Sequence, residues 1–357
     1  MTTGRGHRVS PAVAAAPLED DNVLSEVLVR LSPELPSLPL ASLVCKPWGR
    51  LAASAAFRRR WRDHHGRPPV LGVFDKHLTS LKFIPAVRSI PAERFSIQVC
   101  TAWDTWRVLG CRQGRVLIMN WTLREFLICD PLSGDRHRMS FPPDLVDGGQ
   151  SANGALLSDE EQSPLKLVLV DEARARVEAR VYSTAEPCHL TSVPVTVLGS
   201  RLYCWLTKPP YSFLELNLES QSLALITSPP RANISTRNSQ IIPGEDGAVG
   251  LSILLYPTIE MWNHNIDSHA VATWVLRKTV VMDNFVDLTS SWAAWDSLLI
   301  GYAEDANAIL ISVFKGTCIH VFTVQLETMQ CNRLHGHLLQ NFYYPFASFY
   351  NAGPSER

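Results

Sequence analysis

The sequence lacks the short motifs that mark many enzymes. A nucleophile elbow G-x-S-x-G, a phosphate-binding G-x-x-x-x-G-K-[ST] and a zinc-binding H-E-x-x-H are all absent from its 357 residues. Such motifs hold a nucleophile, a phosphate cradle or two metal ligands at a fixed spacing. We therefore expect a non-catalytic protein that binds no cofactor and no metal.

The sequence also lacks an excess of charge, long apolar runs and paired cysteines. Its 33 Lys and Arg balance 34 Asp and Glu, which removes most support for charge-driven binding to nucleic acid or membrane. No apolar run approaches the ~18 residues that span a bilayer, and Ala12–Ala16 is too short for a signal-peptide core. The eight cysteines stand singly, as expected of reduced thiols. We expect a soluble protein of the cytoplasm, the nucleus or both.

Two kinds of periodicity divide the chain. Up to Arg62 the apolar residues recur at helical spacing, whereas beyond Gly66 they form short runs of period two that Gly, Pro, Asp and Asn interrupt. We predict an α+β protein with two segregated domains, the second mostly antiparallel and all-β. The predicted parts are a disordered leader at 1–16, a helical domain at 17–62, a connector and first strand at 63–75, a β domain at 76–350 and a disordered tail at 351–357.

Three helices are predicted in the first domain. The first begins after Asp20, a typical N-cap residue, and ends before Pro33, because proline restricts the residue ahead of it. A short second helix is expected from Pro39 to Val44 and a third from about Pro47 to Arg62. So small a unit lies near the lower limit at which a domain buries enough apolar surface to be stable alone. We therefore expect it to have a partner.

Hairpins recur in the β domain. Polar turns join apolar strands within 126–139 and 213–226, and related hairpins follow at irregular intervals of about 35 to 60 residues. This interval brackets the blade length of propeller repeats, in which a single four-stranded blade cannot bury its two faces. We predict a propeller-like domain, with a long β-sandwich as the alternative.

The helical segment resembles an F-box over roughly residues 16 to 60. The resemblance depends on the leucine-rich stretch Leu18–Leu31, the string Ser42–Trp48 and the later Phe57. The family has Leu-Pro at the helix entry, where this chain has Leu18 and Glu19. The stretches 64–74, 129–134, 246–251 and 344–350 resemble the F-box-associated or kelch-like β-propeller domain of plant, especially grass-type, F-box proteins.

The resemblance implies a substrate-recognition adaptor of an SCF (Skp1–cullin–F-box) ubiquitin ligase. The helices would dock on a Skp1-like adaptor and the β domain would capture a protein substrate, while the reactive cysteine belongs to another subunit. An apolar face too large to be covered within the helical unit would enter a groove of the partner. The expected Skp1-binding residues are Leu18, Leu24, Val27, Leu28, Leu31, Leu43, Val44, Cys45, Trp48 and Leu51. No substrate-binding residue is assigned, because propeller loops vary freely on a fixed scaffold.

Other conspicuous residues are assigned structural roles. Cys331, His335 and His337 lack a fourth ligand and match no usual zinc spacing, and His64 and His65 are expected to end the third helix. The basic run Arg58–Arg62 is expected to be a solvated helix face rather than a nucleic-acid site. Most tryptophans of the β domain should pack in its core, with one or two as substrate anchors: Trp103, Trp106, Trp121, Trp205, Trp262, Trp274, Trp292 and Trp295.

Two alternative functions remain open. The chain could be an interaction scaffold outside any ligase, in which a degenerate helical unit caps the β domain, and Glu19 favours this reading. It could also be an enzyme with its active site in the central channel of the propeller. That hypothesis predicts ionisable groups that converge in the channel and have perturbed pKa values.

Overall fold

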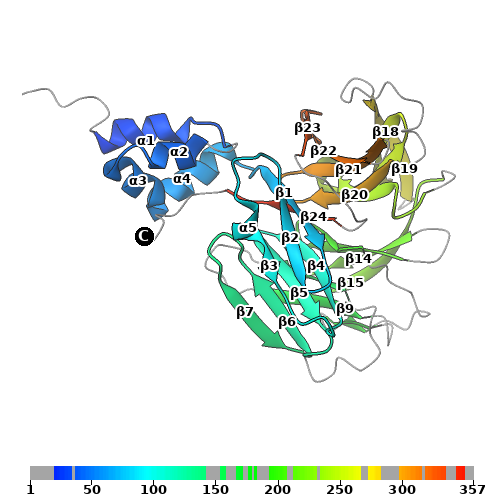
Figure 1. Ribbon diagram of the computed structural model, residues 1–357. Helices are drawn as coiled ribbons and strands as arrows, with labels where there is room; N and C mark the ends of the chain where they lie inside the picture. Colours follow the sequence, from blue (N-terminus) through cyan, green and yellow to red (C-terminus); the bar gives the residue numbers. More distant parts are fainter. Residues whose placement is uncertain are drawn as a thin grey trace, which may run out of the picture. The chain divides into compact units, whose positions relative to one another are not determined.

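The computed structural model describes residues 20–33, 37–141, 153–157, 166–171, 176–178, 181–182, 193–206, 212–230, 234–266, 272–282, 297–315, 318–334 and 343–349. The chain divides into two compact units, the first running up to Gly66 and the second spanning Arg67–Phe349. We call them the helical unit and the β unit, and Figure 1 shows their elements. The leader and tail predicted to be disordered lie outside the described residues. None of the described helices is long and apolar enough to cross a lipid bilayer.

The helical unit contains four helices in its described residues, not the three predicted. They are α1 (Asp21–Val29), α2 (Ser37–Ser42), α3 (Lys46–Ala53) and α4 (Ala55–His65). The helix predicted at 47–62 is two helices, because the backbone of Ser54 is extended. The Ser54 hydroxyl accepts a hydrogen bond of 3.2 Å from the Phe57 amide, so a serine N-cap starts α4. Asp20 caps α1 in the same way through the amide of Asn22.

The core of the helical unit consists of large apolar side chains from α1, α2 and α4. Leu24 and Leu28 are 1% and 0% exposed, and Leu38, Phe57 and Trp61 are also buried. Helices α3 and α4 both pack against α1. The apolar stripe of α1 is therefore largely covered within the unit.

The β unit is built from four-stranded antiparallel sheets, six of them in the described part of the chain. Sheet I has the order β24 (Tyr343–Ala347), β1 (Val70–Lys76), β2 (Ser80–Pro85), β3 (Ile97–Gln98), with α5 (Ala92–Phe95) before β3. Sheet II is β4 (Trp106–Arg112), β5 (Arg115–Asn120), β6 (Glu125–Cys129), β7 (Arg136–Ser140), and sheet III is β8 (Asn153–Leu157), β9 (Lys166–Asp171), β10 (Arg176–Glu178), β11 (Val181–Tyr182).

The remaining three sheets follow the same up-and-down order. Sheet IV is β12 (Thr196–Leu198), β13 (Arg201–Trp205), β14 (Ser212–Asn217), β15 (Ser222–Thr227). Sheet V is β16 (Ser239–Pro243), β17 (Val249–Leu255), β18 (Thr258–Ile266), β19 (Ala272–Val281), and a 3₁₀ turn at Glu245–Gly247 joins β16 to β17. Sheet VI is β20 (Leu298–Ala303), β21 (Ala308–Lys315), β22 (Cys318–Gln325), β23 (Cys331–Arg333).

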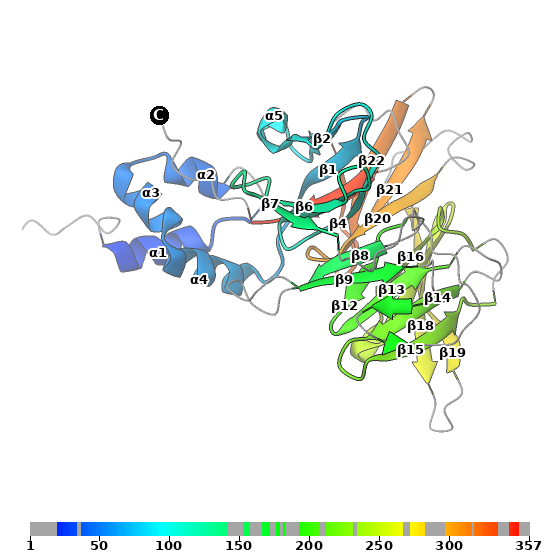
Figure 2. The same cartoon turned by 90° about the horizontal axis from the view of Figure 1, so that it is seen from below.

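The sheets are arranged around a common centre, as Figure 2 shows. The first strand of each sheet lies innermost: β24 contacts β4 and β20, β4 contacts β8, and β16 contacts β12 and β20. One apolar cluster joins β8 to β12 through Ala155 and Val197. Sheet I combines β24 with β1, so strands from opposite ends of the β unit close the arrangement. This topology is that of a β-propeller rather than a sandwich.

Candidate functional site

Three large apolar side chains are exposed close together at the end of α2. Leu40, Leu43 and Val44 are 58%, 76% and 64% exposed. The turn that carries them is held by hydrogen bonds from the amides of Leu43 and Val44 to carbonyls of α2. We call Leu40, Leu43 and Val44 the α2 apolar surface. Exposed apolar groups on an ordered turn are typical of a protein-binding surface.

A second pair of apolar side chains is exposed on α1. Val23 and Val27 are 41% and 43% exposed, one helical turn apart. Leu24 and Leu28, the next residue in each case, are buried. Helix α1 therefore has a buried leucine stripe and a half-exposed valine stripe beside it.

The structure separates the residues predicted to bind Skp1. Val27, Leu43, Val44 and Cys45 are exposed. Leu31, Trp48 and Leu51 are partly exposed, and Leu18 lies outside the described residues. Leu24 and Leu28 are buried within the helical unit, because α3 and α4 pack against the helix that carries them.

Val23 and Leu40 are exposed residues that the sequence interpretation missed. Val23 precedes the predicted Leu24 and Leu40 lies three residues before the predicted Leu43, so helical periodicity found the right segments. Periodicity shows that one face of a helix is apolar. It does not show which edge of that face another helix covers.

The aromatic neighbours of the basic run of α4 are buried. Phe57 and Trp61 are buried and face the interior, so they offer no stacking surface. Arg60 binds Glu26 and Ser25 of α1 and ties the two helices together. Arg58 and Arg59 are exposed, as expected of a solvated helix face.

The two histidines lie at the end of α4. The His65 ring packs on Trp61 with the ring centroids 4.3 Å apart, and Gly66 ends the helix with φ +68°. Burial, aided by the neighbouring His64, lowers the pKa of His65. These contacts give both histidines a structural setting at the helix terminus.

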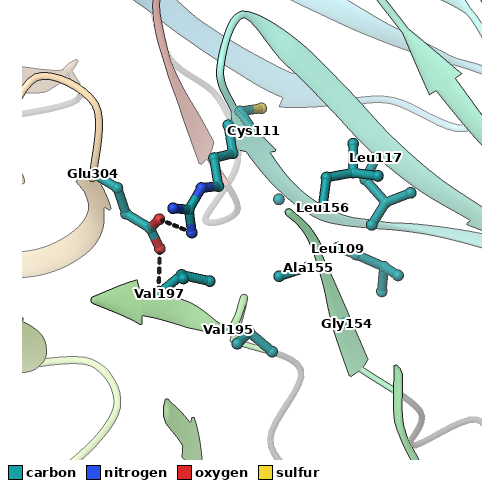
Figure 3. Close-up of a pocket in the computed structure, with 11 residues that line it drawn as sticks. Leu109, Cys111, Leu117, Gly154, Ala155, Leu156, Val195, Val197 and Glu304 are labelled. Atoms are coloured by element: carbon teal, nitrogen blue, oxygen red, sulfur yellow. Dashed lines mark hydrogen bonds and ion pairs between the residues drawn. The ribbon is translucent and has the colours of Figure 1, made fainter. Parts of the chain in front are cut away.

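A small cavity lies at the centre of the β unit (Figure 3). Its lining comes from β4 and β5, from β8 and from the segment around β12, with Glu304 at one side. The Glu304 carboxylate lies 3.1 Å from the Arg112 guanidinium and accepts a hydrogen bond of 2.7 Å from the Val197 amide. The neighbouring Asp305 carboxylate accepts a hydrogen bond of 2.6 Å from the Gln113 amide. Charged groups therefore converge here, as the enzyme hypothesis predicts.

The cavity is small, and its charged groups are buried. Its volume is about 30 Å³, and an adjoining space lined by β20 and β24 has about 60 Å³. On this scale about 10–15 Å³ holds one water molecule, so the two spaces have room for a few ordered waters. Burial raises the pKa of Glu304 to about 7 and outweighs the opposing effect of Arg112. Burial also raises the pKa of the Cys111 thiol far above its usual range, so the thiol is not an activated nucleophile.

The metal-capable residues and the tryptophans named from the sequence are placed as follows. Among the described residues no group of three His, Cys, Asp or Glu could hold a metal ion, and His335 and His337 lie outside that part of the chain. Trp106 and Trp205 are buried, whereas Trp103 is 92% exposed. The other tryptophans are Trp121, Trp262 and Trp274, which are partly buried, and Trp292 and Trp295, which lie outside the described residues.

In the described part of the chain, six antiparallel sheets arranged around a centre with a small charged cavity define a β-propeller. A sequence model of one propeller family, described as F-box protein AT5G49610-like, beta-propeller, matches residues 107–330. The chain belongs to this family of F-box protein β-propellers. No curated protein sequence matches it.

Several solved structures resemble the chain in fold alone. The extracellular domain of the one-component system BT4673 from B. thetaiotaomicron is 12% identical, with a TM-score of 0.35; the match covers 76% of this chain and 30% of that one. Regucalcin, a calcium-binding protein from Agrobacterium tumefaciens, is 15% identical with a TM-score of 0.32, covering 68% and 74%. The Cps50 (Swd1) β-propeller domain of Myceliophteria thermophila is 12% identical with a TM-score of 0.35, covering 76% and 85%.

Proposed function

We propose that this protein is the substrate-recognition adaptor of an SCF-type E3 ubiquitin ligase, acting in the cytoplasm, the nucleus or both. In this role the helical unit is an F-box that docks on a Skp1-like adaptor, and the β unit captures a protein substrate. The protein is then a non-catalytic subunit that contributes binding and geometry. Membership of an F-box protein propeller family and the F-box resemblance of the helices both support the proposal.

The observation that carries the proposal is the α2 apolar surface. Leu40, Leu43 and Val44 are more than half exposed on a turn whose backbone is hydrogen-bonded. Burying such side chains against a partner contributes roughly 1.5–3 kcal/mol for each residue that becomes fully buried. Val27 and the partly exposed Trp48 extend the set of residues available for docking. Leu43 and Val44 of this surface belong to the predicted Skp1-binding set, and a partner can reach them without unfolding the unit.

The proposal is tested by measuring the affinity of the full chain for a recombinant Skp1-type protein. A Leu43→Asp, Val44→Asp double variant should weaken the complex by at least about thirtyfold, the effect expected when a ~2 kcal/mol anchor is lost. The matched control is Leu78→Asp, because Leu78 is 70% exposed but belongs to the β unit. Leu28→Asp is unsuitable as a test, because Leu28 is completely buried and its loss would unfold the helical unit.

The result also separates the proposal from the scaffold alternative. An interaction scaffold outside any ligase predicts that the unmodified chain does not bind Skp1 at all. Tight binding that survives the Leu43→Asp, Val44→Asp double change would retain the adaptor function but reject the α2 apolar surface as the docking site.

A further inference from the structure

The outer strand of each sheet presents one edge to which a further strand could add. In the described part of the chain these strands are β3, β7, β11, β15, β19 and β23, and each pairs on one side only. Strand β7 stands out by charge, because Arg136, His137 and Arg138 are three of its five residues and all three are exposed. Figure 1 shows β7 at the outer end of its sheet.

The other outer strand with adjacent basic residues is β19, but it is irregular there. Met261 of β18 lies opposite Lys278, and Trp262 lies opposite Leu276, so Arg277 has no register partner. Arg277 also forms an ion pair of 2.7 Å with Glu245. A bulge twists an edge away from further pairing. Strand β7 has a continuous register with β6 from Arg136 to Ser140.

The backbone of β7 directs half of its hydrogen-bonding groups outward. The Asp135 carbonyl accepts from Asp130, and the Phe141 amide donates to Arg124, each at 2.9 Å. Alternate residues of an antiparallel strand face the partner strand. The groups of residues 137 and 139 therefore bond to β6, whereas those of Arg136, Arg138 and Ser140 point away from the sheet. Within the described residues no strand pairs with this side of β7, so these three residues offer an edge for main-chain pairing.

The side chains beside this edge supply positive charge on one face. Arg136 and Arg138 are two residues apart and so share a face of the strand. Arg136 donates to the Gln98 carbonyl at 2.9 Å, and Arg138 forms an ion pair of 2.5 Å with Glu125 while its side chain stays 56% exposed. A guanidinium has five N–H donors, so each retains donors for a further carboxylate.

The same charges specify what this edge accepts. Two copies of β7 paired about Arg138 would place arginine directly opposite arginine, and like charges across strands are destabilising. An extended segment with carboxylates opposite Arg136 and Arg138 would gain two favourable cross-strand pairs. The open edge of β7 therefore requires an extended partner, and the positive charge of Arg136 and Arg138 requires that the partner be acidic.

We propose that β7 binds an extended acidic segment of another protein by strand addition, with carboxylates at alternate positions opposite Arg136 and Arg138. If the protein is a substrate adaptor, this segment belongs to the substrate. Only this identification of the partner rests on the proposed function. Main-chain hydrogen bonds supply part of the affinity, and the alternate carboxylates supply the specificity.

The first test uses the full chain and two labelled peptides of equal composition. One alternates Glu and Val, and the other carries its Glu residues in one block and its Val residues in another. Fluorescence polarisation at low salt should show the alternating peptide binding about tenfold more tightly, and added salt should weaken its binding. Equal affinities for the two peptides would overturn strand addition, because a diffuse electrostatic attraction does not distinguish them.

The second test uses variants of the strand itself. Arg136→Ser with Arg138→Ser should weaken the alternating peptide by about tenfold, whereas exposed Arg88→Ser and Arg237→Ser elsewhere on the β unit should not. Ser140→Pro should also weaken it, because it removes an outward N–H while leaving the pairing with β6 and both arginines in place. The unfolding midpoint of each variant identifies any that fails to fold.

The outcomes are distinct. The proposal is wrong if the alternating peptide still binds both the double arginine variant and a folded Ser140→Pro variant. If the unmodified chain self-associates and Ser140→Pro does not, the edge binds a second copy of the chain instead. The affinity for Skp1 is measured separately on the same proteins. An unmodified chain that binds Skp1 but not the alternating peptide therefore rejects this inference alone, and one that binds the peptide but not Skp1 rejects the adaptor function alone.

Discussion

Glu304 and Arg112 form an ion pair of 3.1 Å between sheets VI and II, which are not neighbours in the ring. Sheet I stands between them, because β24 contacts both β20 and β4. The same carboxylate accepts the amide of Val197 in sheet IV. One side chain therefore connects three sheets across the centre.

Glu304→Gln should change how the stability of the protein depends on pH. Burial raises the Glu304 pKa from 4.5 to about 7, so between these values the folded protein holds a proton that the unfolded chain releases. The unfolding free energy contributed by this group therefore falls as pH rises from 4.5 through 7, by on the order of 3 kcal/mol. The glutamine variant lacks this contribution. Urea unfolding at pH 5 and pH 8, followed by tryptophan fluorescence, should show a smaller loss for the variant, and equal losses would contradict the assignment.

Leu28→Ala should destabilise the helical unit. Leu28 is fully buried, and truncation of a buried leucine typically costs about 2–5 kcal/mol because a cavity remains. Leu43→Ala is the matched control, since Leu43 is 76% exposed and should change stability by less than about 0.5 kcal/mol. Thermal melts followed by circular dichroism at a helical wavelength measure both. A similar melting temperature for the two variants would show that Leu28 is not in the core.

Gly72→Ala should destabilise sheet I. A Cβ atom at Gly72 would lie 2.2 Å from the Ile84 carbonyl oxygen and 2.7 Å from the Phe83 ring. The backbone of β2 would have to move to remove this overlap, so we expect the free energy of unfolding to fall by about 1–3 kcal/mol. Gly110→Ala is the control, because its Cβ would meet nothing nearer than Pro194 at 3.9 Å. Denaturant unfolding compares the two, and equal midpoints would contradict the close approach of β1 and β2.

The cysteines should differ widely in reactivity. Cys45 is exposed, whereas Cys129 and Cys204 are buried, and burial raises the pKa of their thiols to about 11 and about 12. Only the thiolate reacts rapidly with maleimides. Brief labelling of the native protein followed by peptide mass spectrometry should modify Cys45 and spare Cys129 and Cys204. Labelling of all three at one rate would show that the β unit opens readily.

Part of the fold could be predicted because it is encoded locally. The change of periodicity after Gly66 predicted strands beyond the helices, and the hairpin of β6 and β7 was found from its polar turn. The break at Ser54 was missed, although serine is a preferred N-cap residue, because the apolar spacing continues through it. Pairing of β1 with β24 has no local signal, since nearly the whole β unit lies between them.

The candidate sites also depend on contacts that have no local signal in the sequence. Periodicity identified the apolar helices but not that Leu24 and Leu28 are covered while Leu40 is exposed. Glu304, Arg112 and Val197 are far apart in the sequence, so no spacing rule could bring them together. Their meeting is a property of the closed ring, and ring closure must be known before such contacts can be found.

The pairing of β24 with β1 sets an order of events during synthesis. Strand β1 leaves the ribosome among the first parts of the β unit, and its neighbour on the inner side, β24, is the last of the described strands to be made. Until then the nascent chain exposes an unpaired edge of β1. A truncated gene or a stalled ribosome would give a propeller without β24, in which the edge of β1 stays unpaired. We expect chaperones and quality-control proteases to recognise that exposed edge.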